Sequence, residues 1–353
     1  MESKKQFSKL LLKWNVTQND RHMPWKGEKN PYFIWLSEII LQQTRVEQGL
    51  PYFLNFKQQY PTVKQLAEAK EDEVMKLWQG LGYYSRARNL HETAKNIHFN
   101  LKGHFPDSFE GLIKLKGVGD YTAAAIASFA FGEKKAVVDG NVIRVLARVF
   151  GIDTARDTTE GKKKFAALAQ ELIDDNEPGP YNQAIMDFGA VACSPQNPQC
   201  DTCPFQKNCL AYQQNRIDEL PTRKKKIKVM ERYFNYLVIK NKSEVFISKR
   251  TGNDIWKNLY ELPMFETAQP LRKNMKAAAA GFLGNKDFDI TSCSEGFVQQ
   301  LTHRKIHSQF IEIEPKSFHT FKPANALKIK ISALNSFAFP KTVHLFLSQK
   351  FLL

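Results

Sequence analysis

No apolar run in the 353-residue sequence approaches the roughly 20 residues that a membrane-spanning helix needs. The first residues are amphipathic and do not form a signal-peptide core, because Lys9 and Lys13 interrupt the apolar positions between Phe7 and Trp14. No internal repeat is visible. We therefore expect an intracellular protein of the cytoplasm or nucleoid, monomeric and with no membrane partner.

Cysteine is scarce, with five residues in the chain, and four of them lie between positions 193 and 209. These are Cys193, Cys200, Cys203 and Cys209, spaced C-x6-C-x2-C-x5-C. Thiols stay reduced inside cells, so such a group indicates a metal site rather than disulfides. Four thiolates from one loop suit a [4Fe–4S] cluster or tetrahedral zinc, and the single C-x2-C pair favours the cluster. Cys293 is expected to be a lone core thiol.

Acidic residues are fewer than basic ones, with 36 Asp and Glu against 51 Lys and Arg, which gives a formal net charge of +15. An excess of this size attracts polyanions, with nucleic acid first and an anionic membrane surface second. With 42% hydrophobic and 25% charged residues, the composition is otherwise that of a globular protein, and the length predicts two domains.

The apolar pattern divides the chain into a helical part and an α+β part. Residues 1–215 predict helices, for example at 33–40, 74–81 and 123–129. The polar and basic stretch 216–231 predicts a linker. Residues 232–353 predict a separate α+β domain.

Within that second part, the segments 233–239 and 245–247 are strand-like. They flank Asn241-Lys242-Ser243, which predicts a β-hairpin. Residues 310–313 alternate like a further strand.

Two glycines form a turn between helical stretches in Leu115-Lys116-Gly117-Val118-Gly119. Both glycines permit positive φ and leave no side-chain bulk, so N–H groups at the start of the next helix can approach a phosphate. Asp139 follows an apolar run and precedes another helix, which predicts an N-cap. Its carboxylate would accept backbone N–H bonds, which favour the ionised form.

Glu38 lies among apolar helical residues, beside Trp35 and Ile39. A Glu in such a helix is usually a surface group at the edge of the apolar face. Partial burial there would instead raise the pKa of Glu38 and retain its proton at neutral pH.

Three of these patterns resemble the endonuclease III–MutY superfamily of helix-hairpin-helix DNA glycosylases. They are the cysteine spacing, the turn with Gly117, Val118 and Gly119, and the V-D-G-N-V motif with Asp139 and Asn141. The resemblance implies a mainly α glycosylase domain in which Asp139 is catalytic, with Asn141 as a further catalytic residue. It also implies that the hairpin grips duplex DNA, and that a [4Fe–4S] cluster organises a loop near the DNA.

The segment Ser37-Glu38-Ile39-Ile40-Leu41-Gln42-Gln43-Thr44 resembles the motif that carries the catalytic Glu of MutY-type adenine DNA glycosylases. Tyr121 stands where bifunctional relatives have a lysine. Because a phenol cannot form the Schiff base of the lyase reaction, Tyr121 implies a monofunctional, hydrolytic enzyme.

The same resemblance assigns contacts with the substrate. Segment 21–25 resembles the segment that lines the adenine pocket, segment 81–89 the one whose first Tyr wedges beside oxidised guanine, and segment 301–303 the F-S-H loop. The implied contact residues are Arg21, Trp25, Lys26, Gln43, Thr44, Leu81, Tyr83, Arg86, Gln183, Thr302 and His303. Gln183 replaces a frequent Glu, which leaves that adenine contact open, and Thr302 replaces Ser but keeps the hydroxyl.

Segment 256–263 resembles a strand of the Nudix-like domain at the C-terminus of MutY proteins. An active Nudix hydrolase would next supply a Glu-rich helix that holds Mg²⁺. Segment 271–277 has no acidic cluster. We therefore expect a recognition domain that is inactive as a hydrolase.

The expected reaction is hydrolytic removal of adenine mispaired with 8-oxoguanine or guanine in duplex DNA. Glu38 would protonate adenine at N7 and then activate water, and Asp139 would stabilise the oxocarbenium-like sugar. Tyr83, Gln43 and the loop with Thr302 would recognise the opposite base. The alternatives are an endonuclease III-like glycosylase/lyase for oxidised pyrimidines, disfavoured by Tyr121, and a non-catalytic DNA-binding iron–sulfur protein, disfavoured by the two retained carboxyl groups.

Overall fold

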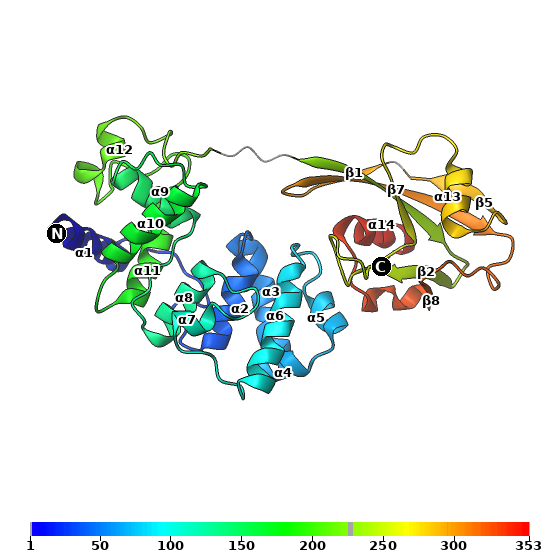
Figure 1. The fold of residues 1–353 in the computed structure, drawn as a ribbon, viewed down its shortest axis with the longest axis horizontal. Coiled ribbons are helices and arrows are strands. Elements are labelled where there is room, and N and C mark those ends of the chain that lie inside the picture. Colours follow the sequence, from blue (N-terminus) through cyan, green and yellow to red (C-terminus); the bar gives the residue numbers. More distant parts are fainter. Residues whose placement is uncertain (1, 225–228, 295, 353) are drawn as a thin grey trace. The chain divides into compact units, whose positions relative to one another are not determined.

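The computed structural model describes residues 2–224, 229–294 and 296–352 (Figure 1). Its contacts divide the chain into two compact units. The first consists of Met1–Glu68 and Asn89–Lys225, and the second of Ala69–Arg88 and Lys226–Leu353. The division falls within the predicted linker, whose residues 225–228 lie outside the described residues.

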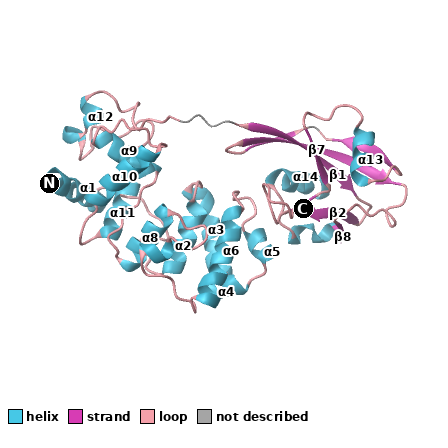
Figure 2. Ribbon diagram, viewed as in Figure 1, coloured by secondary structure: helices cyan, strands magenta, loops and turns pink. Residues whose placement is uncertain are grey.

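The described part of the first unit is helical and contains no strand (Figure 2). Its elements are α1 (Glu2–Thr17), α2 (Pro31–Leu41), α3 (Val46–Gln59), α4 (Val63–Glu68), η1 (Asn96–Asn100), α7 (Phe109–Leu112), α8 (Asp120–Phe131), α9 (Gly140–Val149), α10 (Thr159–Leu172), α11 (Pro178–Asp187), η2 (Phe188–Ala192), η3 (Gln206–Asn208) and α12 (Leu210–Gln213). Helix α6 (Ser85–Lys95) runs from the second unit into the first.

Local sequence explains where the helices that hold the site begin. Helix α2 starts at Pro31, whose ring presets φ at the first helical position, and the Asn30 side chain accepts from the backbone N–H of Tyr32. Helix α8 follows Gly119 and ends at Gly132 in the left-handed conformation, with φ 70°. Helices α2 and α8 pack side by side, and α11 packs against α8 and α1. These contacts bring the starts and ends of several helices to one place.

The second unit contains a helix, α5 (Glu71–Leu77), and two sheets. Its strands are β1 (Met230–Ile239), β2 (Glu244–Lys249), β3 (Tyr260–Glu261), β4 (Met264–Thr267), β5 (Phe288–Cys293), β6 (Phe297–Gln300), β7 (Arg304–Pro315) and β8 (Ala326–Lys330). Its other helices are α13 (Met275–Leu283), η4 (Ile331–Ser336) and α14 (Lys341–Phe351). The larger sheet has the order β4-β1-β7-β5, with β6 paired to β7, and the smaller one the order β3-β2-β8.

Helices α13 and α14 cover opposite faces of the larger sheet. Ala279 of α13 packs with Leu237 and Ile311, while Phe346 of α14 stacks on Phe310 at 3.9 Å between ring centroids. Phe310 and Ile311 are neighbours in β7, and successive side chains of a strand point to opposite faces. Both faces of β7 are therefore buried by a helix, which gives this unit an α+β core.

The predicted β-hairpin at 233–247 is half right. Both strands exist as β1 and β2, but they belong to different sheets, and an isolated bridge between Lys240 and Val245 joins them at the turn. Strand β1 instead pairs in parallel with β7 and antiparallel with β4. Residues 234–239 are all buried, which marks a central strand with partners on both sides. The residues of the turn predicted that β1 would pair with β2, the next strand in the chain. The burial of β1 instead favours pairing with strands that lie further away in the sequence.

Three smaller expectations need correction. The helix predicted over 74–81 ends at Leu77, and the strand expected within 256–263 is only Tyr260–Glu261, because Trp256 and Asn258 have positive φ. Cys293 is exposed and is not a core thiol, because the end of β5 lies at the edge of the sheet.

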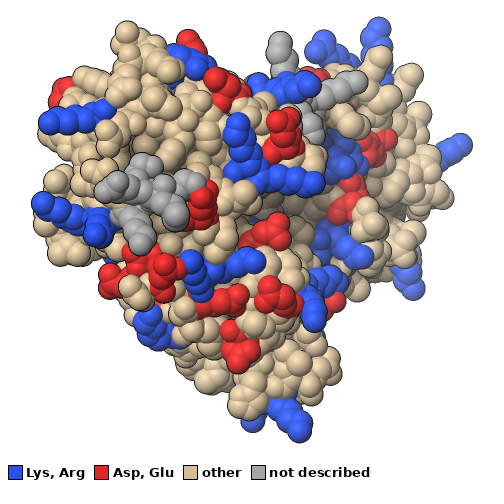
Figure 3. Space-filling model, turned by 60° about the vertical axis from the view of Figure 1, so that its left-hand side comes forward, with Lys and Arg blue, Asp and Glu red and all other residues tan. Residues whose placement is uncertain are grey.

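Among the described residues, no helix combines the length and apolarity required to cross a membrane. The basic excess does not form a single patch on the face drawn in Figure 3, where Lys and Arg side chains are interspersed with Asp and Glu.

Candidate active site

A cavity of about 470 Å³ opens in the first unit where α2, α8, α9 and α11 meet. Its walls combine the end of α2, the starts of α8 and α9, and the loop before α2. The lining residues are Arg21, Met23, Trp25, Glu38, Leu41, Gln42, Gln43, Thr44, Val46, Tyr121, Asp139, Gly140, Asn141, Gln183 and Met186. The cavity thus joins residues predicted from five separate segments of the sequence.

Glu38 is the buried acid of this cavity, with 7% of its surface exposed. The pKa of Glu38 is raised to about 7, chiefly by burial. The hydrogen bond with Tyr121 opposes this increase in part, and the charge of Asp139 adds to it. The predicted burial is confirmed, and the acid retains a proton over much of the neutral range. A protonated carboxyl group facing a cavity can act as a general acid.

Asp139 caps α9, as its sequence context predicts. Its Oδ1 accepts from the backbone N–H of Val142 at 2.8 Å, and its Oδ2 accepts from Asn141 Nδ2 at 2.9 Å. Burial raises the pKa of Asp139, while these hydrogen bonds and the charge of Arg144 lower it. Burial outweighs the capping bonds that were expected to dominate. The N-terminal end of α9 still directs partial positive charge at the carboxylate.

Tyr121 lies in the first turn of α8 and brings a neutral hydroxyl into the cavity. Burial and the nearby charges of Glu38 and Asp139 raise the pKa of this phenol well above its ordinary value. Its hydroxyl also lies 3.3 Å from Met186 Sδ. The phenol therefore stays protonated at neutral pH and offers no amine at this position.

Trp25 and Gln43 are further predicted residues that line the cavity. Trp25 is 8% exposed and packs edge-on against Phe53, with 5.3 Å between ring centroids. Gln43, two residues beyond the end of α2, adopts the left-handed conformation, with φ 56°. Strain of this kind in a non-glycine residue concentrates at functional sites. Lys26 lines a second cavity, of about 220 Å³, that shares Trp25, Glu38 and Gln183 with the first.

The predicted hairpin lies between α7 and α8, and its two glycines differ. Gly117 has φ 77°, and a Cβ there would lie 2.7 Å from the Cβ of Asn89. Gly119 has φ −97°, so positive φ is not its role, but a Cβ there would meet nothing within 4 Å. Val118 is buried and anchors the turn. The first N–H groups of α8 follow this bare turn, which suits contact with a phosphate.

The four clustered cysteines line one small cavity between the end of η2 and α12. All four are free of disulfides. Burial, together with the neighbouring cysteines, raises the pKa of Cys203 to about 11. No three His, Cys, Asp or Glu side chains of the described residues are arranged so that they could hold a metal ion. The donors therefore surround one space, but without metal-ligand geometry.

Two arginines of α9 fasten the cysteine loop, and neither was expected from the sequence. Arg148 is 2% exposed and donates to the carbonyl oxygens of Ser194 and Pro195 and to Cys193 Sγ. Arg144 donates through Nε to the carbonyl oxygen of Cys193 at 2.8 Å and through Nη2 to Asn141 Oδ1 at 2.9 Å. The sequence signal that could have predicted their role is the spacing of four residues between two arginines in a largely apolar helix.

The second unit brings together two predicted residues that lie 219 positions apart. The hydroxyl oxygens of Tyr83 and Thr302 are 2.6 Å from each other. Tyr83 is 46% exposed, and its φ of 48° is again left-handed. The Arg86 guanidinium lies 5.5 Å from the centre of the Tyr83 ring. Leu81, by contrast, is 5% exposed and packs inside the unit.

Thr302 and His303 form the exposed turn between β6 and β7. The turn is closed by a bond from Leu301 N to the carbonyl oxygen of Arg304 at 2.7 Å. The carbonyl oxygen of His303 accepts from Met230 N at 3.0 Å. The turn is therefore tied to two strands while its side chains face outward.

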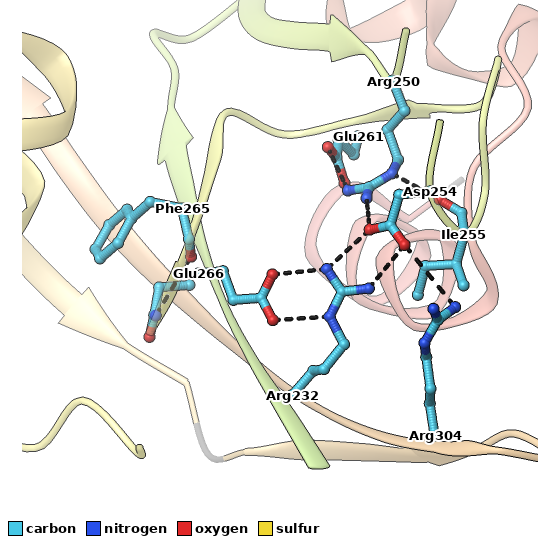
Figure 4. Close-up of polar contacts among 9 residues, drawn as sticks. Arg232, Arg250, Asp254, Ile255, Glu261, Phe265, Glu266 and Arg304 are labelled. Carbon is cyan, nitrogen blue, oxygen red and sulfur yellow. Dashed lines mark hydrogen bonds and ion pairs between the residues drawn. The ribbon is translucent and has the colours of Figure 1, made fainter. Parts of the chain in front are cut away.

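A charged network lies at the base of this turn (Figure 4). Asp254 accepts from Arg232 at 2.9 Å and from Arg250 at 3.2 Å, and Arg304 lies 3.8 Å away. Burial would raise the pKa of Asp254, but the hydrogen bonds and charges of the arginines bring it below its ordinary value. Arg304 directly follows His303 and is the first residue of β7, so the network restrains the position where the turn enters that strand.

Comparison with known proteins gives two family matches and several relatives. Residues 36–173 match the family described as HhH-GPD superfamily base excision DNA repair protein, and residues 235–349 match the NUDIX domain. The chain is similar to the adenine DNA glycosylase of Buchnera aphidicola subsp. Acyrthosiphon pisum, with 33% identity over 92% of this chain and 91% of the relative. For the adenine DNA glycosylase of Buchnera aphidicola subsp. Schizaphis graminum, identity is 39% over 74% of this chain and 75% of the relative.

Among solved structures, a thermostable thymine-DNA glycosylase resembles this chain with a TM-score of 0.56 and 30% identity. The likeness covers 60% of this chain and 98% of that protein. It supports the predicted mainly α glycosylase fold.

Proposed function

Because the chain belongs to the adenine DNA glycosylase family, we propose that it hydrolyses the N-glycosidic bond of adenine mispaired with 8-oxoguanine or guanine in duplex DNA. The observation that carries this proposal is the buried Glu38, with a pKa near 7, in the same cavity as Asp139. One carboxyl group that keeps its proton beside another that is capped by a helix is the arrangement that glycosidic hydrolysis requires.

In the proposed reaction, adenine leaves the base stack and enters the cavity of the first unit. Glu38 donates its proton to N7 as the bond between C1′ and N9 breaks, so adenine departs as a neutral base. The Asp139 carboxylate stabilises the positive charge on the sugar. Glu38 then takes a proton from the water whose oxygen bonds to C1′, which restores the acid and leaves an abasic site.

We propose that the hairpin with Gly117, Val118 and Gly119 binds a DNA phosphate without reading sequence. Thr44 and Asn141 would contribute polar contacts at the cavity mouth, and Asn141 would also orient Asp139 through their hydrogen bond. The helical part over 1–215 would perform excision as a monomer.

We propose that the base opposite adenine is recognised in the second unit by Tyr83, Thr302 and His303, with Arg86 supporting the Tyr83 ring. Their support is the hydroxyl contact between Tyr83 and Thr302 and the exposure of both side chains. Gln43, in the first unit, is also proposed to recognise the base opposite adenine. Since segment 271–277 lacks an acidic cluster, the NUDIX-type domain over 232–353 would serve recognition rather than hydrolysis.

Cys193, Cys200, Cys203 and Cys209 would hold a [4Fe–4S] cluster. Four unpaired thiols around one cavity are a suitable donor set, because their mutual repulsion as thiolates calls for a cationic group among them. The cluster would organise the loop beside α9 and take no part in base excision.

One assay tests the proposed function. The protein is incubated with duplexes that carry adenine opposite 8-oxoguanine, adenine opposite guanine, or thymine glycol, and the strands are then heated in alkali. We expect the strands treated with the protein to break at the adenine position only after alkali is added. Strand breaks at thymine glycol without alkali would identify an endonuclease III-like glycosylase/lyase, and binding without base release a non-catalytic protein.

A further inference from the structure

Asp187, the last residue of α11, is a buried carboxylate that no sequence motif singled out. Its side chain has no exposed surface. Its Oδ1 accepts from Arg21 Nη1 at 2.8 Å and from Gln183 Nε2 at 3.0 Å. Its Oδ2 accepts from Asn19 Nδ2 at 3.0 Å, with Lys26 Nζ at 3.1 Å. Both oxygens are thus occupied by donors, and two cations compensate the buried charge.

This contact decides which end of the Gln183 amide faces the cavity. Gln183 precedes Asp187 by four residues, so the two side chains lie on one face of α11. A primary amide has a donor end and an acceptor end, whereas a carboxylate only accepts. The nitrogen of Gln183 must therefore face Asp187, and its carbonyl oxygen must turn away. In the described part of the chain, no protein donor occupies that oxygen.

Gln183 lines both cavities that reach Glu38. A base that presents its N7 to Glu38 in this space presents the substituent at C6 on the same edge of the purine. Adenine carries an amino group there, which donates, while hypoxanthine carries an oxygen, which accepts. A freely rotating amide could satisfy either base by turning over, but a fixed one cannot.

We propose that Asp187 is a positioning residue that fixes the polarity of Gln183, so that the pocket presents an acceptor to the 6-amino group of adenine and disfavours purines with an oxygen at C6. This inference rests on the proposed function. Both oxygens of a carboxylate accept hydrogen bonds, so a Glu at position 183 would need no fixed orientation to accept from the 6-amino group. A glutamine has only one accepting end, and Asp187 explains how that end is directed to the base.

The test compares single-turnover excision of adenine and hypoxanthine, each opposite 8-oxoguanine, by the full-length chain. Asp187→Asn is expected to lower the adenine-to-hypoxanthine rate ratio roughly ten- to hundredfold, the effect of one misdirected hydrogen bond in a desolvated site. A general structural defect would slow both bases alike and leave the ratio unchanged. Asp174→Asn is the matched control, since Asp174 also accepts a side-chain hydrogen bond, but from Ser8, which lines neither cavity, whereas Gln183 lines both.

A swapped pair provides the rescue. In the double variant Gln183→Glu with Asp187→Asn, the asparagine amide donates to the glutamate, whose second oxygen accepts in any orientation. The ratio should return toward the wild-type value, and this variant alone decides the question if Asp187→Asn does not fold. Adenine release with an unchanged ratio in Asp187→Asn, or a swapped pair without preference, would overturn the inference alone. A wild type that releases no adenine would instead refute the proposed function on which it depends.

Discussion

At the scale of single residues, the proposed chemistry depends on one proton held by Glu38. The acid form is the active one, and the pKa of Glu38 is raised to about 7 by burial. We therefore expect single-turnover excision to fall as the pH rises through about 7, where Glu38 loses its proton. Excision should also fall at low pH, where the Asp139 carboxylate, whose pKa is raised by burial, takes up a proton. Glu38→Gln should bind the mispair normally but excise at least about 10²–10⁴-fold more slowly at every pH. Near-normal excision by this variant would remove Glu38 from the mechanism.

The same burial should make Glu38 a cost to stability. Its pKa is about 7 in the folded protein against an ordinary 4.5, so folding favours the protonated form of Glu38. The folded protein is therefore most stable below pH 4.5, where Glu38 is protonated in both states, and it loses this stability as the pH rises through about 7. Glutamine never ionises, so Glu38→Gln should have a higher free energy of unfolding than wild type at pH 8, by at most about 3 kcal/mol. At pH 4.5 the two proteins should be equally stable, and urea unfolding at both pH values measures the difference. Glu110→Gln, at an exposed position, should show no such dependence on pH. Equal stability of the Glu38 variant and wild type at pH 8 would contradict the burial.

Tyr121 separates the hydrolytic enzyme from a lyase. Wild-type product strands should stay intact until alkali is added, because a buried phenol cannot form a Schiff base. Tyr121→Lys should give partial covalent trapping by borohydride. Trapping should increase with pH, because Glu38 and Asp139 surround the position and would hold the new amine in its protonated form. Trapping by the wild type itself would favour the lyase.

At the scale of elements, the cysteine loop and α9 form one piece. Cys200→Ser should lose iron, near four per chain in anaerobically purified wild type, and should lower DNA affinity more than the excision rate of the bound complex. Cys293→Ser is the matched control, because this cysteine is exposed and lies in the other unit. It should retain iron and colour. A colourless wild type with one zinc per chain would replace the cluster with a zinc site.

Elements governed by local patterns were predictable, and those governed by distant partners were not. Helix α2 and the cap at Asp139 follow from neighbouring residues. The pairing of β1 with β7 does not, because local turn chemistry cannot report a partner some 70 residues away. Asp187 escaped notice for the same reason. A single Asp at the end of a helix carries no motif, and three of its four donors come from residues 19–26, about 160 positions away.

At the scale of the whole molecule, the contacts assign Ala69–Arg88 to the unit that contains the NUDIX-type domain, although this segment interrupts the helical part in sequence. Lys249 Nζ lies 2.7 Å from Asp72, and Arg88 donates to the carbonyl oxygen of Lys257 at 2.8 Å. Motifs identified the segment by Tyr83 but could not show its partner. The fold of each unit was therefore predictable from periodicity and resemblance, and the placement of this insertion was not.

The molecule is expected to hold DNA in two ways, by charge that acts on any phosphate and by side chains that act on one base. The net charge of +15 should make binding strongly dependent on salt, because each phosphate that a cation neutralises releases a counterion. The hydroxyl and imidazole of Thr302 and His303 should instead act on one base. We expect the double variant Thr302→Ala with His303→Ala to reduce the preference for 8-oxoguanine over guanine by roughly three- to a hundredfold, for one or two lost hydrogen bonds. The slope of affinity against salt should not change.

Charge removal from the linker provides the complementary variant. Arg223→Gln with Lys224→Gln should weaken both mispairs alike and reduce the salt slope by about one to two, while the base preference stays intact. The measurement is the dissociation constant for both mispairs across a salt series, in wild type and both variants. If the Thr302 and His303 variant keeps the full preference, then that turn is not the reader, and Tyr83 and Gln43 must discriminate without it.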